Sequence, residues 1–242
     1  MQWLLGGELH PGGEAGTRRA LELIDVRPGM RLLDVASGTG TSALVAAREY
    51  GCMVVGAEYG ESAVLVARRA AAAAGLGDRV RFVTGDAELL PFEDGRFDAV
   101  LCECSLCTFE DKPAALREIR RVLRPGGRLA LCDVVADRPR LPVELDGALA
   151  TVACIGGALS VNGYGDLIAA ADLCLTGIER RDDDAAALAE RVHDRLRGAR
   201  ILGFDSPVST PIGIDEAVAL VAAARYAIAQ GALGYAIFTA ER

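Results

Sequence analysis

The sequence predicts a doubly wound α/β domain, in which a parallel sheet is covered by helices on both faces. Short apolar runs rich in β-branched residues alternate with longer stretches rich in alanine and leucine. This alternation is typical of consecutive strand–helix units, which form parallel sheets. A length of 242 residues, 51% of them hydrophobic, suits one domain with a well-filled core.

The first half of the chain is expected to supply five strands and the helices that connect them. Each expected strand is a short apolar run, and each expected helix is longer and has helical spacing of its apolar residues. The strands are expected at 30–36, 52–58, 80–87, 97–105 and 128–135. The helices are expected at 42–51, at 61–75, and from Lys112 to the break at Pro125-Gly126-Gly127.

From residue 137 onward the pattern is looser. Helices are expected at 142–160, 162–173, 184–204 and 214–231, followed by a closing strand at 233–242. No Pro- or Ser-rich linker separates this half from the first, so a single domain is expected over 1–242. Its parts are an N-terminal lid or helix at 1–26, a core at 27–137, and a helical substrate cap with the last strands at 138–242.

The charge and the cysteine content restrict the partners and the compartment. With 26 basic and 34 acidic residues the chain carries −8, which argues against nucleic acid and anionic membranes as partners. No apolar run approaches the ~20 residues of a membrane span, and the N-terminus lacks the features of a signal peptide. Seven scattered cysteines indicate reduced thiols in a cytoplasmic protein. A monomer and a homodimer both remain open.

A glycine-containing turn follows the first expected strand and opens a helix. In Asp34-Val-Ala-Ser-Gly38-Thr-Gly40, the glycines let backbone N–H groups approach a ligand at the helix N-terminus. A tight strand–helix turn alone would have the same pattern. Glu58 ends the second strand 18 positions later, where a carboxylate can accept ribose hydroxyls. The third glycine of a dinucleotide fingerprint is replaced by Ala43, which favours a nucleoside that carries a cation.

Five motifs in a fixed order resemble the class I S-adenosylmethionine (SAM)-dependent methyltransferases. The resemblance covers about 27–137 and rests on "LLDVASGTG", "VVGAE", "GDAELLPFEDGRFDAV", "LCECSL" and "LREIRRVLRPGGRLALCDV". It implies a Rossmann-like methyltransferase fold with a seven-stranded, mostly parallel sheet. It also implies SAM as the cofactor, with a methyl group passing in line to a small-molecule acceptor.

The resemblance implies a cofactor site at the carboxyl ends of the first four strands. The glycine turn would surround the methionine and ribose, Glu58 would hold the ribose hydroxyls, and Tyr59 would flank adenine. The full set is Asp34, Ala36, Gly38, Gly40, Glu58, Tyr59, Asp86, Ala87 and Glu103. Many relatives have glycine in place of Ala36, whose methyl group would crowd the cofactor slightly.

Methyl transfer from a sulfonium depends mainly on approach and alignment, which can contribute ~7–11 kcal/mol. No catalytic base is therefore required, and the sequence shows no obvious one. Three candidates are His10 in a glycine-rich N-terminal stretch, and Glu103 and Asp133 at the ends of the fourth and fifth strands. The other histidine, His193, is expected on a solvated helix face.

Three cysteines, Cys102, Cys104 and Cys107, lie at the carboxyl end of the fourth expected strand. Cys102 and Cys104 would share a strand face about 6.6 Å apart, which is poor geometry for a disulfide. Their spacing with Cys107 supplies at most three zinc ligands, so no metal site is expected. They either fill the core or line a substrate pocket. Cys52, Cys132 and Cys174 are expected in the core.

The segment "ACIGGALSVNGYGDLIAAADL" at 153–173 resembles arsenite methyltransferases. That resemblance implies Cys154 as an arsenic ligand, with Cys104 matching a second one, and As(III) is soft and thiophilic. The further cysteines of that family, near each terminus, are missing here.

Three functions therefore stay open. The chain is a methyltransferase that acts on carbon, oxygen or nitrogen of a small molecule, similar to the ubiquinone/menaquinone-type branch, with Cys104, Cys107 and Cys154 lining its pocket. Alternatively it is an arsenite methyltransferase that uses Cys104 and Cys154, or a SAM-binding sensor or assembly module without catalysis.

Overall fold

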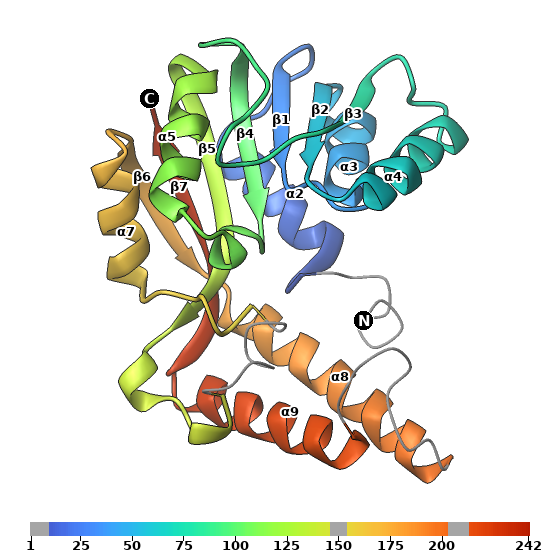
Figure 1. The fold of residues 1–242 in the computed structure, drawn as a ribbon, viewed down its shortest axis with the longest axis vertical. Coiled ribbons are helices and arrows are strands. Elements are labelled where there is room, and N and C mark those ends of the chain that lie inside the picture. The colour runs from blue at the N-terminus through green and yellow to red at the C-terminus, as the bar shows by residue number, and fades with distance from the viewer. Residues whose placement is uncertain (1–9, 146–153, 203–212) are drawn as a thin grey trace.

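A computed structural model describes residues 10–145, 154–202 and 213–242. A seven-stranded sheet with the order β3-β2-β1-β4-β5-β7-β6 forms its centre (Figure 1). The strands are β1 (Arg31–Val35), β2 (Met53–Glu58), β3 (Val80–Thr84), β4 (Phe97–Glu103), β5 (Leu123–Ala136), β6 (Cys174–Arg180) and β7 (Leu233–Glu241). The first five strands are parallel, and β7 pairs antiparallel with both β5 and β6. The predicted seven-stranded, mostly parallel sheet is confirmed.

Helices cover both faces of this sheet, as a doubly wound fold requires. They are α2 (Gly13–Leu23), α3 (Thr41–Tyr50), α4 (Glu61–Ala73), α5 (Lys112–Val122), α7 (Val161–Ala170), α8 (Asp182–Ile201) and α9 (Ile214–Ala229). Short 3-10 turns lie at η1 (Leu106–Thr108), η2 (Arg138–Arg140) and η3 (Val143–Leu145). The apolar sides of α2, α3 and α4 share one buried cluster, and those of α5 and α7 share the cluster on the opposite face.

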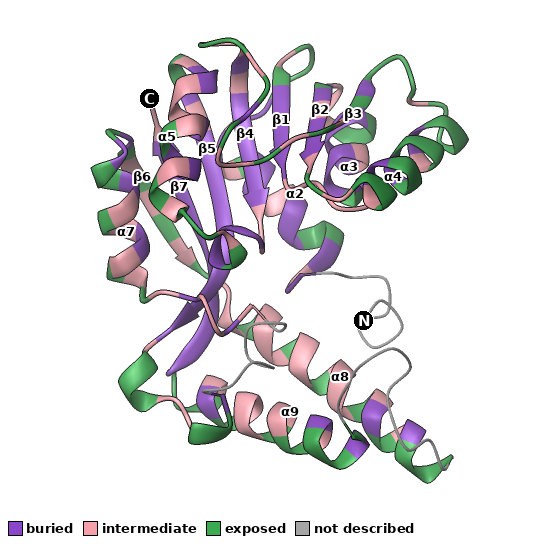
Figure 2. Cartoon of the chain, in the orientation of Figure 1, coloured by how far each residue is buried: buried purple, intermediate pink, exposed green. Residues whose placement is uncertain are grey.

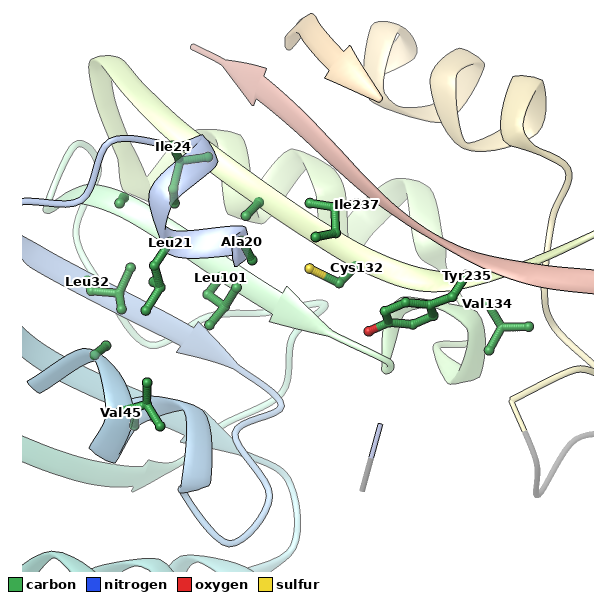
Figure 3. Packing of buried hydrophobic residues seen from close by; sticks show 14 of the residues in the cluster. Ala20, Leu21, Ile24, Leu32, Val45, Leu101, Cys132, Val134, Tyr235 and Ile237 are labelled. Atoms are coloured by element: carbon green, nitrogen blue, oxygen red, sulfur yellow. The ribbon is translucent and has the colours of Figure 1, made fainter. Parts of the chain in front are cut away.

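The central strands are apolar because both of their faces are buried. Leu32 and Leu33, neighbours on β1, are both fully buried, one in each cluster. Figure 3 shows Ala20 and Leu21 of α2 packed with Leu101 and Cys132 on the first of these faces. In the described residues no helix is both long enough and apolar enough to span a membrane.

Helices α8 and α9 lie beyond the carboxyl ends of the parallel strands (Figure 1) and share a small cluster of their own. Both carry many exposed and half-exposed residues, unlike the buried strands (Figure 2). The sequence predicts a substrate cap in this part of the chain, and that role of α8 and α9 stays a prediction.

Several expected elements differ from the structure. The edge strand β6 was not expected, and Cys174, predicted to end a helix in the core, begins this strand and is exposed. Of the helix expected at 142–160, the structure shows only η3 and a turn at 154–159, and 146–153 lie outside the described residues. Asp86 lies beyond β3, which ends at Thr84, and Asp133 lies inside β5 rather than at its end.

Cys102 and Cys104 do not share a strand face, contrary to the prediction. β4 ends at Glu103, and Cys104 leaves the strand with a left-handed φ of 51°. Cys102 is buried in the cluster under α5, whereas Cys104 packs against the cluster on the opposite face.

Candidate cofactor site

The turn after β1 has the backbone of a ligand-binding loop. Ala36, Gly38 and Gly40 have φ values of 55°, 53° and 89°, and Gly40 precedes the first turn of α3. A Cβ on Gly40 would lie 2.4 Å from Cζ of Phe82, so only glycine fits there. A Cβ on Gly38 would have no atom within 4 Å, because Gly38 borders a cavity.

That cavity has a volume of about 450 Å³ and lies at the carboxyl ends of β1 and β4. It lies between the turn after β1, the start of α3 and the N-terminal part of α2. Its lining residues are His10, Gly12, Gly13, Glu14, Ala15, Arg18, Asp34, Ala36, Ser37, Gly38, Thr39, Thr41, Ser42 and Glu103. The cavity thus brings together five of the predicted site residues, His10, Asp34, Ala36, Gly38 and Glu103, whereas Gly40 and Glu58 do not line it.

Asp34 is the most unusual group in this cavity. Its side chain is 2% exposed, and its Oδ2 has no hydrogen-bond partner among the described residues. Burial, followed by the nearby charge of Glu103, raises the pKa of Asp34 well above its usual value. An unpartnered buried carboxyl oxygen costs free energy unless a ligand satisfies it.

Glu103 ends β4 and is held by two hydroxyl groups. It accepts hydrogen bonds from Thr17 (3.0 Å) on α2 and from Ser42 (2.6 Å) on α3. Nε2 of His10 lies 3.9 Å from the same carboxylate. No local sequence pattern points to Thr17 or Ser42, because their role depends on contacts between elements far apart in the chain.

Glu58 supports the loop from the end of β2. Its carboxylate accepts hydrogen bonds from the backbone N–H groups of Gly38 (2.9 Å) and Gly60 (2.8 Å). Asp34 and Glu103 line the cavity and favour a cationic ligand, whereas Glu58 does not line it and supports the loop from behind.

The part of the site expected around adenine is more open. Tyr59 is 77% exposed, Asp86 is also exposed, and Asp86 accepts a hydrogen bond from the N–H of Glu88 (2.9 Å). Tyr59, Asp86 and Ala87 are not among the residues that line the cavity.

The two remaining catalytic candidates differ in access. The buried Nδ1 of His10 lies 3.2 Å from the carbonyl oxygen of Pro11, so that nitrogen can donate there and leave Nε2 as an acceptor. Asp133 is fully buried, does not line the cavity, and accepts hydrogen bonds from the N–H groups of Cys107 and Val134, both 2.8 Å long. Burial raises the pKa of Asp133 to about 7.

Two other polar side chains were not identified correctly from the sequence. Tyr235 on β7 is 2% exposed, and its hydroxyl has no partner among the described residues. Figure 3 shows its ring beside Cys132, with the hydroxyl directed away from the backbone of β7. His193, expected on a solvated face, is half-buried on α8 and its Nδ1 is buried.

The substrate candidates come together at the end of β4. Cys107 in η1 and Cys104 lie near Cys154, whose Sγ is 3.6 Å from the carbonyl oxygen of Cys104. Among the described residues no group of three or more His, Cys, Asp or Glu side chains is placed to hold a metal ion.

A doubly wound sheet of this order with an acidic cavity at its carboxyl edge is the arrangement that the resemblance to class I SAM-dependent methyltransferases predicts. SAM fits the residues present, because its ammonium and sulfonium groups suit the carboxylates and its polar groups can satisfy Asp34. Residues 33–131 match the family described as a methyltransferase domain. Within this matched segment the chain is similar to ubiquinone/menaquinone-type methyltransferases, which are among its curated relatives.

Curated relatives match about half of the chain. Methyltransferase GfsG of Streptomyces halstedii is 41% identical over 127 residues, which are 52% of this chain and 46% of GfsG. Demethylmenaquinone methyltransferase of Thermus thermophilus is 45% identical over 117 residues, 48% of this chain and 52% of that protein. The chain thus spans about half the length of the curated relatives it matches.

Solved structures match over the whole chain. The [4+2]-cyclase SpnF is 27% identical with a TM-score of 0.77, and the likeness covers 100% of this chain and 91% of SpnF. Phosphoethanolamine N-methyltransferase 2 of Haemonchus contortus has a TM-score of 0.82 at 20% identity, with 100% of this chain and 56% of that one covered. The latter likeness shows the fold alone.

Proposed function

We propose that this chain transfers a methyl group from SAM to an organic small molecule. The observation that carries the proposal is the acidic cavity at the carboxyl ends of β1 and β4, where the buried Asp34 has an unpartnered oxygen. Such a group fits the ammonium of the methionine part of SAM, and a cavity of about 450 Å³ accommodates a ligand of nucleoside size.

The residues have distinct roles in this proposal. Asp34 and Glu103 bind the cationic end of the ligand, and the amide of Gly38 borders it. Glu58 accepts the ribose hydroxyls while it holds the loop through Gly38 and Gly60. Tyr59, Asp86 and Ala87 stay predicted contacts of the adenine ring.

SAM, when bound, supplies an activated methyl group. The chain has to orient the acceptor, exclude water and, for a hydroxyl or amine acceptor, remove a proton. His10 can take that proton at Nε2 while its Nδ1 donates to Pro11, and Glu103 at 3.9 Å would stabilise the resulting imidazolium. Burial raises the pKa of Tyr235 well above its usual value, but Tyr235 does not line the cavity and has no role in this proposal.

An organic acceptor is favoured over a macromolecule. The charge of −8 disfavours nucleic acid, and two relatives are named for demethylmenaquinone and for ubiquinone or menaquinone biosynthesis. Free thiols in all seven cysteines are consistent with the predicted cytoplasmic location.

The test is transfer of label from methyl-labelled SAM to a panel of quinols, phenols, enols and amines. Label in an organic acceptor, abolished by Asp34→Asn and strongly reduced by His10→Gln for hydroxyl acceptors, is the expected result. SpnF, which this chain resembles, is named for a cyclisation and not for methyl transfer. SAM binding and methyl transfer must therefore be measured separately. SAM binding without transfer to any acceptor would support a binding module or another reaction and would contradict our proposal.

Arsenite–thiol complexes belong in the same panel, because Cys104, Cys107 and Cys154 lie together. Methylated arsenic, lost in Cys154→Ser and Cys104→Ser but retained in Cys174→Ser, would establish the arsenite alternative. Failure of arsenite to accept methyl or to protect the thiols would exclude it. The described residues show no preformed metal-ion geometry, which argues against the arsenite alternative.

A further inference from the structure

Three thiols converge at the point where the chain enters α7 beside the end of β4. Cys104 follows β4, Cys107 lies in η1, and Cys154 precedes the buried Ile155. The Sγ of Cys154 lies 3.6 Å from the carbonyl oxygen of Cys104, and the thiols of Cys104 and Cys107 are the groups that act on its ionisation. These residues are free cysteines in the structure. The Sγ of Cys154 thus contacts the segment after β4, which lies 50 residues earlier in the sequence.

The backbone holds two of these cysteines in an unfavourable conformation. Cys104 and Cys154 have φ values of 51° and 63°, in the left-handed region that non-glycine residues seldom occupy. Such backbone strain is concentrated at functional sites. Gly157 is also required here, because a Cβ on it would overlap the carbonyl oxygen of Cys107.

The three thiols are chemically unequal. Cys104 and Cys107 donate to the sulfur of Cys154, which lowers the pKa of Cys154 and makes it the first to ionise. Its interaction with the Cys154 sulfur, then burial and the neighbouring negative charges, raise the pKa of Cys107. The thiol of Cys107 also donates to Asp133, whose carboxylate accepts the Cys107 N–H as well. The cluster therefore contains one nucleophilic sulfur, one thiol beside a base, and a third thiol.

The remaining cysteines lack these features. Burial raises the pKa of Cys102 to about 12 and that of Cys52 to about 11, and both are inert at neutral pH. Cys174 is exposed on β6, away from the cluster. Only the cluster combines a thiolate, a neighbouring thiol and a carboxylate base among the described residues.

We propose that Cys154 and Cys107 are a reversible oxidation site, at which a hydroperoxide converts the two thiols into a disulfide. The Cys154 thiolate attacks the peroxide oxygen and becomes a sulfenic acid, and a hydroxide or alkoxide leaves. Asp133 then accepts the proton of Cys107, whose sulfur attacks the sulfenic sulfur and expels hydroxide, which the proton neutralises. With hydrogen peroxide, two thiols and one peroxide give one disulfide and two waters.

This bond would connect η1 to the segment that enters α7. The connection lies close to Glu103, the residue before Cys104, so oxidation would restrain the edge of the cofactor cavity. The covalent step itself does not depend on the methyl transfer proposed above, and its test uses no enzymatic activity.

The test treats the reduced chain with equimolar hydrogen peroxide, blocks free thiols, and maps disulfides by mass spectrometry of digests without reductant. A Cys107–Cys154 bond that dithiothreitol reverses is the expected result. Cys107→Ser and Cys154→Ser should abolish it, whereas Cys104→Ser and the matched control Cys174→Ser should retain it. A bond from Cys154 to Cys104, or no disulfide while all thiols react singly, would overturn the proposal.

Trapping of the sulfenic acid intermediate gives a second measurement, which can be made on the wild-type chain. Dimedone, which reacts with sulfenic acids, should label Cys154 in the wild-type chain during oxidation. The labelling should rise several-fold in Cys107→Ser, and Asp133→Asn should slow disulfide formation at least tenfold and raise the labelling as the intermediate accumulates. Dimedone labelling of Cys107 in place of Cys154 would contradict the assigned roles.

Discussion

Two carboxyl groups, Asp34 and Asp133, are buried for different reasons at the same edge of the sheet. Asp34 faces the cavity with one oxygen unpartnered, whereas Asp133 is surrounded by donors from Cys107 and Val134. Neither is paired with a cationic side chain in a hydrogen bond or ion pair that the structure shows. Each therefore resists ionisation and affects stability, and Asp34 also faces the ligand.

The stability of the ligand-free chain should fall as the pH rises from about 4 to 7. Burial raises the pKa of Asp133 to about 7 and that of Asp34 well above its usual value, whereas both titrate near ~3.9 when unfolded. The folded state thus holds more protons in this window, and the free energy of unfolding decreases with pH. Carboxylates paired with arginine, such as Glu49 with a pKa of about 2, make the free energy of unfolding rise with pH. They do so mainly at lower pH than this window.

Urea denaturation at several pH values without cofactor measures this dependence. Asp133→Asn should flatten the curve, and the exposed control Asp78→Asn should not. A wild-type stability that is constant or rises between pH 5 and 7 would contradict burial of uncharged carboxyl groups.

Replacement of Glu58 by Gln should weaken SAM binding about 10- to 100-fold. The amide cannot accept from both Gly38 and Gly60, and a hydrogen bond to a charged group contributes about 1.5–3 kcal/mol. Calorimetric titration with SAM checks this, with the exposed Glu61→Gln in the first turn of α4 as control. Equal affinities for the two variants would remove Glu58 from the site.

At the scale of elements, the strand–turn–helix unit from β1 to α3 determines the site. Each of its special backbone positions has a different cause. Gly40 is required by Phe82 behind it, Gly38 borders the cavity, and Ala36 takes a φ of 55° that glycine would adopt without strain.

Two alanine substitutions should separate stability from binding. Gly40→Ala should cost about 2–5 kcal/mol of unfolding free energy, because a Cβ adds both strain and a clash with Phe82. Gly38→Ala should cost only about 1–2 kcal/mol but weaken SAM binding, since its methyl group would enter the cavity. Denaturation and titration of both variants check this, and a reversed order would contradict the placement of the loop.

The predictability of the elements follows from their burial. β1 to β5 could be predicted because parallel strands with two buried faces are continuous apolar runs. β6 could not, because this edge strand alternates exposed and half-exposed residues and contains the polar Thr176 and Glu179. The turn at Cys104 was also missed, since its left-handed φ is imposed by contacts that the local sequence does not contain.

At the scale of the molecule, α2 connects the cavity to four other elements. Thr17 donates to Glu103 on β4, Arg18 pairs with Glu49 on α3, and Arg19 pairs with Glu179 on β6. At its start, Gly12 lies against Asp184 of α8. The sequence predicted a lid or helix here but could not predict these contacts, because each partner is distant in the chain.

Thr17→Val should therefore affect both the fold and the site. It removes one of the two hydroxyl donors of Glu103 at a fully buried position, for a cost of about 1–3 kcal/mol. Thermal denaturation should show a lower Tm, by about 2–10 °C, and SAM titration a weaker affinity. Thr84→Val at the exposed end of β3 is the control, and indistinguishable Tm and affinity for the two variants would contradict the bridging role of α2.

Binding of SAM by the acidic cavity is the central claim, and isothermal titration of the wild-type chain and Asp34→Asn with SAM tests it most directly. The wild type should bind one SAM per chain, and the variant should bind at least tenfold more weakly while its unliganded fold stays intact by circular dichroism. No binding by the wild type, or equal binding by the variant, would contradict the claim.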